Sequence, residues 1–382
     1  MRPFVKMTGC GNDFVVLEAS DLESLETAST GFGVTATTAS GSGQAMLDKT
    51  DIRAMCDRRN GIGCDQLLVI AAQPVQMDAR SGAPVAAVSM QIYNSDGSEA
   101  LACGNATRCV AQLWMDRELE DDARREQVLA AGEQVVVVIT ASRTLRCWRA
   151  LDRSTPSKTI PSTTIAQDPF QNVNVFVDMG LPEFEWTRIP LSRDVQRGSA
   201  LDAVTDLGLA DAPKDVASLL ARGVAVGMGN PHLVFLLPSE EQLNQIDVRA
   251  VGSKLETNAL FPQGVNVTFA AIGPAATTGS NAEASRRILA KVWERGAGET
   301  LACGSAACAV IAAAQRTGVL VAPAATAADN AANQSVFSVQ MPGGTLQVGI
   351  SAQGTMVLAG PSRVVFVGVY SPPSQSALTA PA

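Results

Sequence analysis

The sequence predicts an α/β protein made of two similar domains, and three observations support this prediction. At 382 residues the chain exceeds the size at which one hydrophobic core usually stops growing. Most of its apolar segments are short runs typical of β-strands, and only two have helical character. The motif Leu-Ala-Cys-Gly occurs twice, at 101–104 and 301–304, and each copy precedes one of those helices. A duplicated unit of strand, polar turn, Cys-Gly and helix therefore indicates two related domains.

The predicted strands are short apolar runs, many of them rich in Val, Ile and Phe. They are 13–19, 65–72, 88–94, 134–141, 173–180, 232–237, 265–272, 287–294, 345–350 and 363–370. The predicted helices are 105–119 and 305–316. Because the second helix is almost wholly apolar, we expect it to be buried.

Several segments of small, polar or Pro-rich residues have little periodicity and are expected to be insertions outside the core. They are a Gly-rich loop at 27–45, a hairpin loop at 74–87, a linker at 152–170, a loop at 322–335, and the C-terminal tail 371–382.

Charge and composition exclude several classes of function. The net charge of −8 disfavours nucleic acid and anionic membranes as partners, since both attract basic patches. There is no run of 18 apolar residues and no apolar segment typical of a signal peptide, so we expect a cytoplasmic protein. The eight cysteines are therefore expected to be free thiols. With a single histidine, His232, and without a Cys-x-x-Cys pair, the sequence predicts no metal site.

The repeated Cys-Gly motif has the chemistry of a helix start. Backbone N–H groups at a helix N-terminus bind carboxylates and stabilise thiolates, so Cys103 and Cys303 are expected to have lowered pKa values. Asn105 and Ser305 are favourable N-cap residues. A lone cysteine in such a place is more often a small buried hydrophobe. Duplication of the whole motif favours catalysis instead.

We call each Cys-Gly pair at a helix start, Cys103–Gly104 and Cys303–Gly304, a corner. Two such corners facing each other would hold one substrate between two thiols. One thiol acting as thiolate base and the other as acid would remove a proton from one face of a carbon and return it on the other. This inverts a stereocentre. The duplication therefore predicts a racemase or an epimerase.

Seven segments, in order along the chain, resemble the diaminopimelate epimerase family, whose members work with two cysteines and without pyridoxal phosphate. They are KMTGCGNDFVV (6–16), RRNGIGCDQLLVI (58–70), YNSDGSEALACGNATRC (93–109), MGNPHLVF (228–235), GVNVTFA (264–270), VWERGAGETLACGSAACA (292–309) and GPSRVVFVGVY (360–370).

This resemblance implies two pseudo-symmetric domains, each a curled mixed sheet around a central helix, with the active site in the cleft between them. It implies a first domain of 1–177 plus 360–382, because the last strand returns there, and a second of 178–359. The implied reaction is epimerisation of L,L-diaminopimelate to meso-diaminopimelate, in lysine and peptidoglycan precursor biosynthesis, with no cofactor. The partner is then a small amino-acid substrate, and the chain could form a homodimer.

Carried over by position, the catalytic pair is Cys103 and Cys303, and His232 tunes the thiols. Backbone N–H groups of the two helix starts would bind the carboxylate at the reacting carbon, and polar side chains would hold the rest of the substrate. The substrate-binding residues so implied are Asn12, Gln66, Asn94, Gly104, Asn105, Asn230, Asn266, Glu294, Arg295, Gly304 and Ser305. Without the resemblance, Asn12 and Asn94 are as well explained as turn residues, and Glu294 and Arg295 as a solvated pair.

The chain departs from the family pattern where two glycines are replaced by Ala106 and Ala306. We expect their methyl groups to tighten the carboxylate pocket. This leaves open a related two-thiol racemase acting on another amino acid, such as histidine or proline. A binding protein without activity would be expected to have lost a thiol, and neither is lost.

Overall fold

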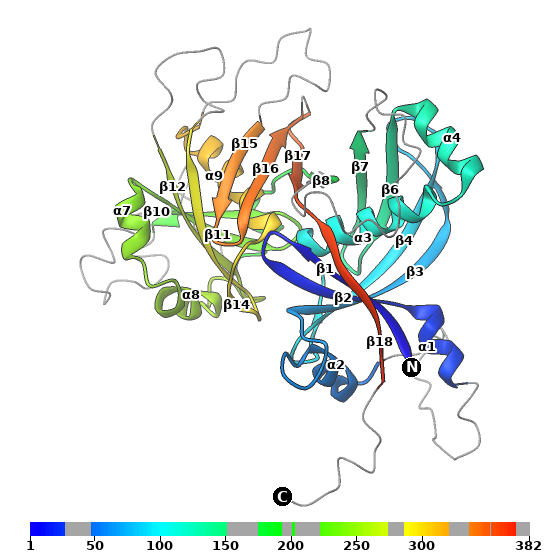
Figure 1. The fold of residues 1–382 in the computed structure, drawn as a ribbon. Helices are drawn as coiled ribbons and strands as arrows, with labels where there is room; N and C mark the ends of the chain where they lie inside the picture. Colours follow the sequence, from blue (N-terminus) through cyan, green and yellow to red (C-terminus); the bar gives the residue numbers. More distant parts are fainter. Residues whose placement is uncertain are drawn as a thin grey trace, which may run out of the picture.

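The computed structural model describes residues 1–26, 47–150, 175–192, 201–202, 222–273, 286–320, 336–351 and 353–371. It confirms an α/β fold with much strand and few helices, arranged as two halves (Figure 1). The predicted loops at 27–45, 152–170 and 322–335 lie outside the described residues, as does the tail beyond residue 371. Among the described helices, none is long and apolar enough to cross a membrane.

The first half contains β1 (Arg2–Gly9), β2 (Asn12–Glu18), α1 (Ala19–Glu26), α2 (Lys49–Cys56), β3 (Gln66–Met77), β4 (Pro84–Asn94), β5 (Glu99–Ala100), α3 (Gly104–Glu118), α4 (Asp122–Ala131), β6 (Glu133–Ile139), β7 (Thr144–Ala150) and β8 (Val175–Gly180).

The second half contains β9 (Leu201–Asp202), β10 (Arg222–Gly227), β11 (Pro231–Leu237), α7 (Glu240–Gln245), α8 (Val248–Glu256), β12 (Asn266–Ile272), β13 (Ile288–Glu294), β14 (Gly298–Thr300), α9 (Gly304–Arg316), β15 (Val336–Met341), β16 (Gly344–Ile350) and β17 (Met356–Gly360). The last strand, β18 (Arg363–Tyr370), belongs to the first half.

The two halves repeat one pattern of strand pairing. In the first, β1–β2, β3–β4 and β6–β7 are antiparallel, whereas β2–β3 and β4–β6 are parallel. In the second, β10–β11, β12–β13 and β15–β16 are antiparallel, whereas β11–β12 and β13–β15 are parallel. Each half also has a two- or three-residue strand, β5 or β14, just before its long helix. The duplication read from the Cys-Gly motif thus extends over both sheets.

The long helices α3 and α9 lie in the core because their surfaces are apolar. Helix α3 packs on β1, β6 and β8, and α9 packs on β10, β11 and β16. Residues from both helices belong to one hydrophobic cluster that runs across the two halves. The halves therefore share a core where their helices meet.

Two strand pairings join the halves. Strand β8 pairs with β7 on one side and with β17 on the other, so it belongs to both sheets. Strand β18 returns to the first half and pairs with β1 (Figure 1). The predicted boundary between the domains, after residue 177, falls inside β8, which pairs with a strand of each half. The boundary therefore stays a prediction.

The predicted hairpin loop at 74–87 is wrong in extent. Strands β3 and β4 continue through most of it, and the turn occupies only residues 78–83. Asp78 stabilises this turn by accepting hydrogen bonds from Ser81, and its carboxylate pairs with Arg146 at 2.7 Å. The segment is polar because the ends of both strands are exposed, with Val75 and Met77 each 66% accessible.

Candidate active site

The two Cys-Gly corners meet where the halves join. A Cβ placed on Gly304 would lie 3.4 Å from the Cα of Gly104 and only 2.6 Å from Cδ2 of Leu358. A Cβ on Gly104 would lie 3.5 Å from the Cα of Gly304. The two backbones are thus in van der Waals contact, and the side chain of Leu358 leaves no room for a Cβ at Gly304. This contact places the first turns of α3 and α9 next to each other.

The helix starts differ from the prediction by one or two residues. Cys103 and Cys303, both with extended backbones, are the N-caps, and the helices begin at Gly104 and Gly304. The expected N-caps, Asn105 and Ser305, are already second residues of their helices. The prediction was wrong because the Cys103 sulfur itself takes the capping place, accepting from Ala106 N at 3.5 Å.

The third residue of each helix, Ala106 or Ala306, is fully buried and belongs to the shared core. Their methyl groups fill core volume. The expectation that these methyls face the carboxylate pocket is therefore not supported by their positions.

The thiols have raised rather than lowered pKa values, which corrects the sequence-based expectation. Burial, with the charge of Glu294 adding to it, raises the pKa of Cys103 to about 12 and that of Cys303 well above its usual value. Backbone N–H groups at the helix starts do act to lower both pKa values, as expected, but loss of hydration outweighs them. Both thiols are therefore protonated near neutral pH.

Glu294 is the acidic side chain beside the thiols. It ends β13, accepts a hydrogen bond from Thr300 Oγ1 at 2.5 Å, and forms a side-chain hydrogen bond with Cys303. Its charge also acts on Cys103. Burial raises the pKa of Glu294, although the Thr300 and Cys303 contacts oppose this shift. The sequence analysis grouped Glu294 with residues for the far end of the substrate, whereas these contacts join it to the thiols.

The other predicted site residues occupy matching places in the two halves. Gln66 opens β3 as Asn266 opens β12. Asn94 ends β4 as Glu294 ends β13. Asn12 opens β2, and Asn230 immediately precedes the corresponding strand, β11. The residues carried over from the family are thus related by the same pseudo-symmetry as the cysteines.

In the first half these residues form a hydrogen-bonded set. Gln66 Nε2 donates to Asn94 Oδ1 at 3.0 Å, and Asn105 Nδ2 donates to Asn12 Oδ1 at 2.5 Å. Asn12 Nδ2 in turn donates to Asp65 at 3.3 Å. Asn12 is buried in this set. Asn94 lies at a turn, where its backbone N–H donates to Ser98 O and its carbonyl accepts from Gly97 N–H.

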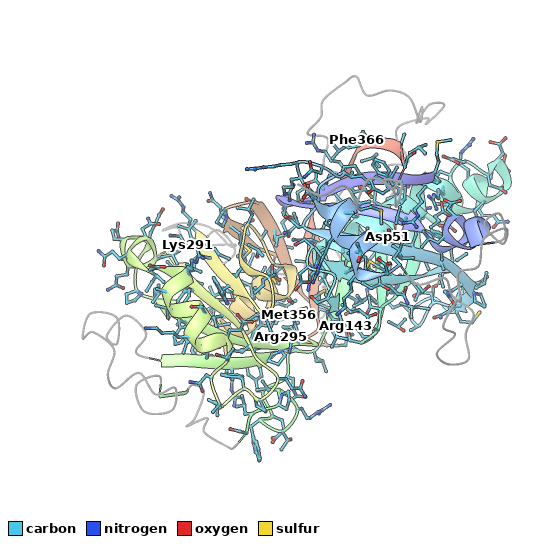
Figure 2. The ribbon with its side chains drawn as sticks, turned by 90° about the horizontal axis from the view of Figure 1, so that it is seen from below. Asp51, Arg143, Lys291, Arg295, Met356 and Phe366 are labelled. Atoms are coloured by element: carbon cyan, nitrogen blue, oxygen red, sulfur yellow. The ribbon has the colours of Figure 1, made fainter. Side chains whose placement is uncertain are left out.

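The second half positions Arg295 and His232. The Arg295 backbone N–H donates to Asn266 Oδ1 at 2.9 Å, and its guanidinium donates to Gln263 O at 2.6 Å. His232 is fully buried with Nε2 2.9 Å from Asn230 Oδ1. Burial, helped by the charges of Arg295 and Arg143, lowers the pKa of His232 to about 3. Figure 2 shows Arg143 and Arg295 near Met356, between the two halves.

Sequence reasoning missed Arg108 and Asp65, although both lie among these groups. Arg108 donates to Asn105 Oδ1 at 2.7 Å from within a helix that is otherwise largely apolar on its buried side. The available signal was an arginine three residues after Asn105, in the first turns of a helix expected to be central. Asp65 directly precedes Gln66, and its role depends on tertiary contacts.

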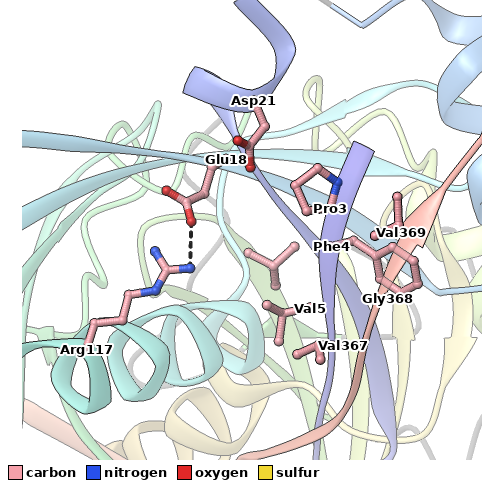
Figure 3. Close-up of a pocket in the computed structure, with 10 residues that line it drawn as sticks. Pro3, Phe4, Val5, Glu18, Asp21, Arg117, Val367, Gly368 and Val369 are labelled. Carbon is pink, nitrogen blue, oxygen red and sulfur yellow. Dashed lines mark ion pairs between the residues drawn. The ribbon is translucent and has the colours of Figure 1, made fainter. Parts of the chain in front are cut away.

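A surface pocket lies away from the cysteines. It is a cavity of about 350 Å³ between β1, β18 and the end of α3, bordered by the Arg117–Glu18 ion pair of 2.7 Å (Figure 3). Its lining is mostly apolar and includes neither catalytic cysteine. We therefore assign the site from the cysteine corners.

Comparison with known proteins shows a family match over both halves of the chain. The family model described as diaminopimelate epimerase matches residues 4–145 and 224–365. A diaminopimelate epimerase from Phenylobacterium zucineum is 34% identical over 96% of this chain and 97% of its own length. One from Rhodospirillum centenum is 33% identical, covering 97% and 93%.

Solved structures share the fold at low identity. A predicted epimerase from Pseudomonas aeruginosa superposes with a TM-score of 0.55 at 15% identity, covering 96% of this chain and 98% of its own. A probable proline racemase from Agrobacterium radiobacter gives 0.52 at 13% identity, covering 98% and 94%. Together with the family match over both halves, the full-length relatives show that this chain belongs to the diaminopimelate epimerase family.

Proposed function

We propose that this chain interconverts L,L- and meso-diaminopimelate by moving protons between the substrate and two thiols. The observation that carries the proposal is the contact between Gly104 and Gly304, which brings both Cys-capped helix starts to one place. Two full-length relatives named diaminopimelate epimerase support the choice of substrate. The chain is accordingly an isomerase.

The two helix N-termini receive the carboxylate next to the reacting carbon. Their first backbone N–H groups, from Gly104, Asn105, Gly304 and Ser305, have no partners within the helix and carry partial positive charge. A carboxylate held there is stabilised as negative charge builds up on the adjacent carbon. The α-carbon then lies between the sulfurs of Cys103 and Cys303.

The proton balance requires one thiolate and one thiol. The thiolate takes the α-proton from one face, and the electron pair of the broken C–H bond stays on the substrate as a carbanion. The opposite thiol then gives its proton to the other face, where the electron pair forms the new C–H bond. The first sulfur ends as thiol and the second as thiolate, so the reverse reaction uses the same groups with exchanged roles.

Glu294 is the group placed to generate the thiolate. Because its carboxyl hydrogen-bonds Cys303 and has a raised pKa, it can accept the Cys303 proton in a site where water is excluded. A buried carboxylate also keeps the thiols protonated until the ammonium group of the zwitterionic substrate arrives. The substrate ammonium lowers the cost of a thiolate beside it.

The distal amino-carboxylate end is proposed to lie along Asn94, Asn230, Asn266 and Arg295. Arg295 suits a carboxylate, since a guanidinium can donate two parallel hydrogen bonds. A racemase for proline or histidine would need no second amino-carboxylate subsite. The distal polar set is therefore one reason to favour diaminopimelate over those amino acids.

We propose a cytoplasmic location, because two catalytic thiols work only where the medium keeps them reduced. We also propose a homodimer formed through β18. Along this strand Val367 and Val369 are 71% and 59% exposed, and Phe366 is 44% exposed. Figure 2 shows Phe366 on the outside of the first half, away from Arg143 and Arg295. An apolar strand so exposed is a surface that a second copy would cover.

The test is to incubate the purified protein with L,L-diaminopimelate and, separately, with L-proline and L-histidine, and to separate the stereoisomers by chiral chromatography. We expect meso-diaminopimelate to appear and the other two amino acids to stay unchanged. Glu294→Gln should lower turnover strongly, with Glu299→Gln, an exposed neighbour on β14, as the control. Racemisation of proline or histidine with diaminopimelate left intact would reject the proposed substrate.

A further inference from the structure

Arg108 is fully buried, and its hydrogen bonds within the described residues go to Gly104 O and Asn105 Oδ1 rather than to a carboxylate. It is the largest side chain among those with almost no exposed surface. Within the described part of the chain, the ionisable groups with the largest effect on its charge are thiols, those of Cys10, Cys109, Cys103 and Cys308. Burying an unpaired charge is costly, so its presence calls for a role that an apolar residue could not fill.

Its guanidinium lies at the junction of the two corners. Nη1 is 3.5 Å from Gly104 O and would be 3.6 Å from a Cβ on Gly304. Nη2 donates to Asn105 Oδ1 at 2.7 Å and would be 3.3 Å from a Cβ on Gly360. The backbone of Arg108 thus belongs to the first half, and its guanidinium lies against the backbone of both corners.

The hydrogen bonds that start at Arg108 have only one possible direction. An arginine can only donate, so the atom of Asn105 that faces it must be oxygen. The Asn105 amide nitrogen then points the other way and donates to Asn12 Oδ1 and to Ala302 O, the latter at 3.0 Å. Asn12 is in turn left with its nitrogen toward Asp65, a carboxylate that can only accept.

This series fixes two amides between a cation and an anion. Neither Asn105 nor Asn12 can turn over without placing two donors or two acceptors face to face. The bond to Ala302 O also ties α3 to the residue just before Cys303. The relative position of the two thiols therefore depends on Arg108. None of the hydrogen bonds described for Arg108 goes to a sulfur.

We propose, building on the proposed epimerase function, that Arg108 is a positioning residue which orients Asn105 across the junction and places a buried positive charge beneath the two helix N-termini. A carboxylate bound to the N-termini, or a thiolate at Cys103, gives this charge the counter-ion that it otherwise lacks. Arg108 thereby stabilises the site most when the substrate or the thiolate is present.

The charges around Cys103 agree with this role. Burial and Glu294 raise the pKa of the Cys103 thiol, whereas Arg108 and the N–H groups of Ala106 and Asn105 lower it. Arg108 is the one side chain among these causes that favours the thiolate.

The test compares Arg108→Met, Arg108→Lys and wild type, with Arg149→Met as matched control. Arg149 is also a buried arginine of the first half, but it pairs with Asp116 and Gln134 away from the cysteines. In Arg108→Met we expect kcat to fall by about 100-fold or more, with a smaller change in KM. The pH at which Cys103 becomes reactive to iodoacetamide should rise, because Arg108 lowers the pKa of this thiol.

Arg108→Lys keeps the positive charge but loses the guanidinium that orients Asn105. Its alkylation should have the wild-type pH profile, whereas its kcat should fall. If Arg108→Met does not fold, Arg108→Lys still tests the proposal. Arg149→Met should lower Tm while keeping kcat and the pH profile. If both Arg108 variants keep kcat and the profile within twofold, Arg108 is merely structural and the proposal is overturned. A wild-type protein that does not epimerise diaminopimelate would instead reject the proposed function, while the alkylation profile would still test the charge of Arg108.

Discussion

Gly104 and Gly304 lie against each other, so close that a Cβ on either would come within 3.5 Å of the other's Cα. These residues are 200 positions apart and start the central helices of different halves. Their contact explains why the chain contains the Cys-Gly motif twice: each copy supplies one thiol and one helix N-terminus to a single site.

Gly304→Ala should disturb this contact more than Gly104→Ala. The new Cβ would lie 2.6 Å from Leu358 Cδ2, against 3.2 Å for Gly104. We expect Gly304→Ala to cost about 1–3 kcal/mol of stability, as overpacking usually does, and to lower kcat. Leu358→Ala should cost less stability in the Gly304→Ala protein than in wild type, because it removes the clash as well as buried contacts. Thermal unfolding and initial rates check this, and a Gly304→Ala protein equal to wild type in both would show that the corners need not touch.

Cys103→Ala and Cys303→Ala should each abolish epimerisation, because inversion needs an acid and a base on opposite faces. Each single variant can still eliminate halide from a β-halo analogue of the substrate, a reaction that needs only one base. The measurement is halide release beside stereoisomer analysis. Near wild-type epimerisation by either variant would contradict the two-thiol mechanism.

Arg295→Ala should raise KM for diaminopimelate by roughly 10- to 150-fold, since a lost charged hydrogen bond costs about 1.5–3 kcal/mol. We expect kcat to change less, because Arg295 acts on the distal end. Arg249→Ala, on the exposed face of α8, serves as control. Steady-state kinetics that give Arg295→Ala an unchanged KM would remove this residue from the site.

His232 should make stability depend on pH. Burial, with Arg295 and Arg143 adding to it, lowers its pKa to about 3 in the folded chain, whereas the unfolded value is about 6.5. The unfolded state therefore binds the proton first, so stability is full above about pH 6.5 and is lost as pH falls toward 3. Between pH 7 and 5 this loss amounts to about 2 kcal/mol.

Urea unfolding of wild type and His232→Gln at both pH values measures this contribution. The variant should lose less stability than wild type between pH 7 and 5, whatever its stability at pH 7. Equal losses in the two proteins would show that His232 is not the titrating group.

The sequence predicted the central helices well because each begins at a repeated motif and is apolar over several turns. Helix α9 was expected at 305–316 and spans Gly304–Arg316. Other elements were missed because their signals are local and weak. Helix α2 is short and largely polar, and it depends on its Asp48 N-cap, which accepts from Asp51 N. Strand β15 alternates exposed and buried residues beside a segment of low complexity.

The sequence suggested which residues make up the candidate site, but not the direction in which the pKa values of its thiols shift. The helix starts do lower the thiol pKa values, as the sequence suggested, yet the net shift is upward. Its cause is burial between the two halves, which no local pattern shows. Arg108 was missed for the same reason, since its partners come together only when the two corners meet.

The most direct test of the two-thiol account is the fate of the α-proton in heavy water. The protein is incubated with L,L-diaminopimelate in D₂O, and both stereoisomers are analysed by mass spectrometry at early times. Two thiols on opposite faces predict that every meso-diaminopimelate molecule carries one deuterium at the inverted carbon, while recovered L,L-diaminopimelate carries almost none. Meso-diaminopimelate that keeps its original proton at that carbon would mean that one group serves both faces, which contradicts the account.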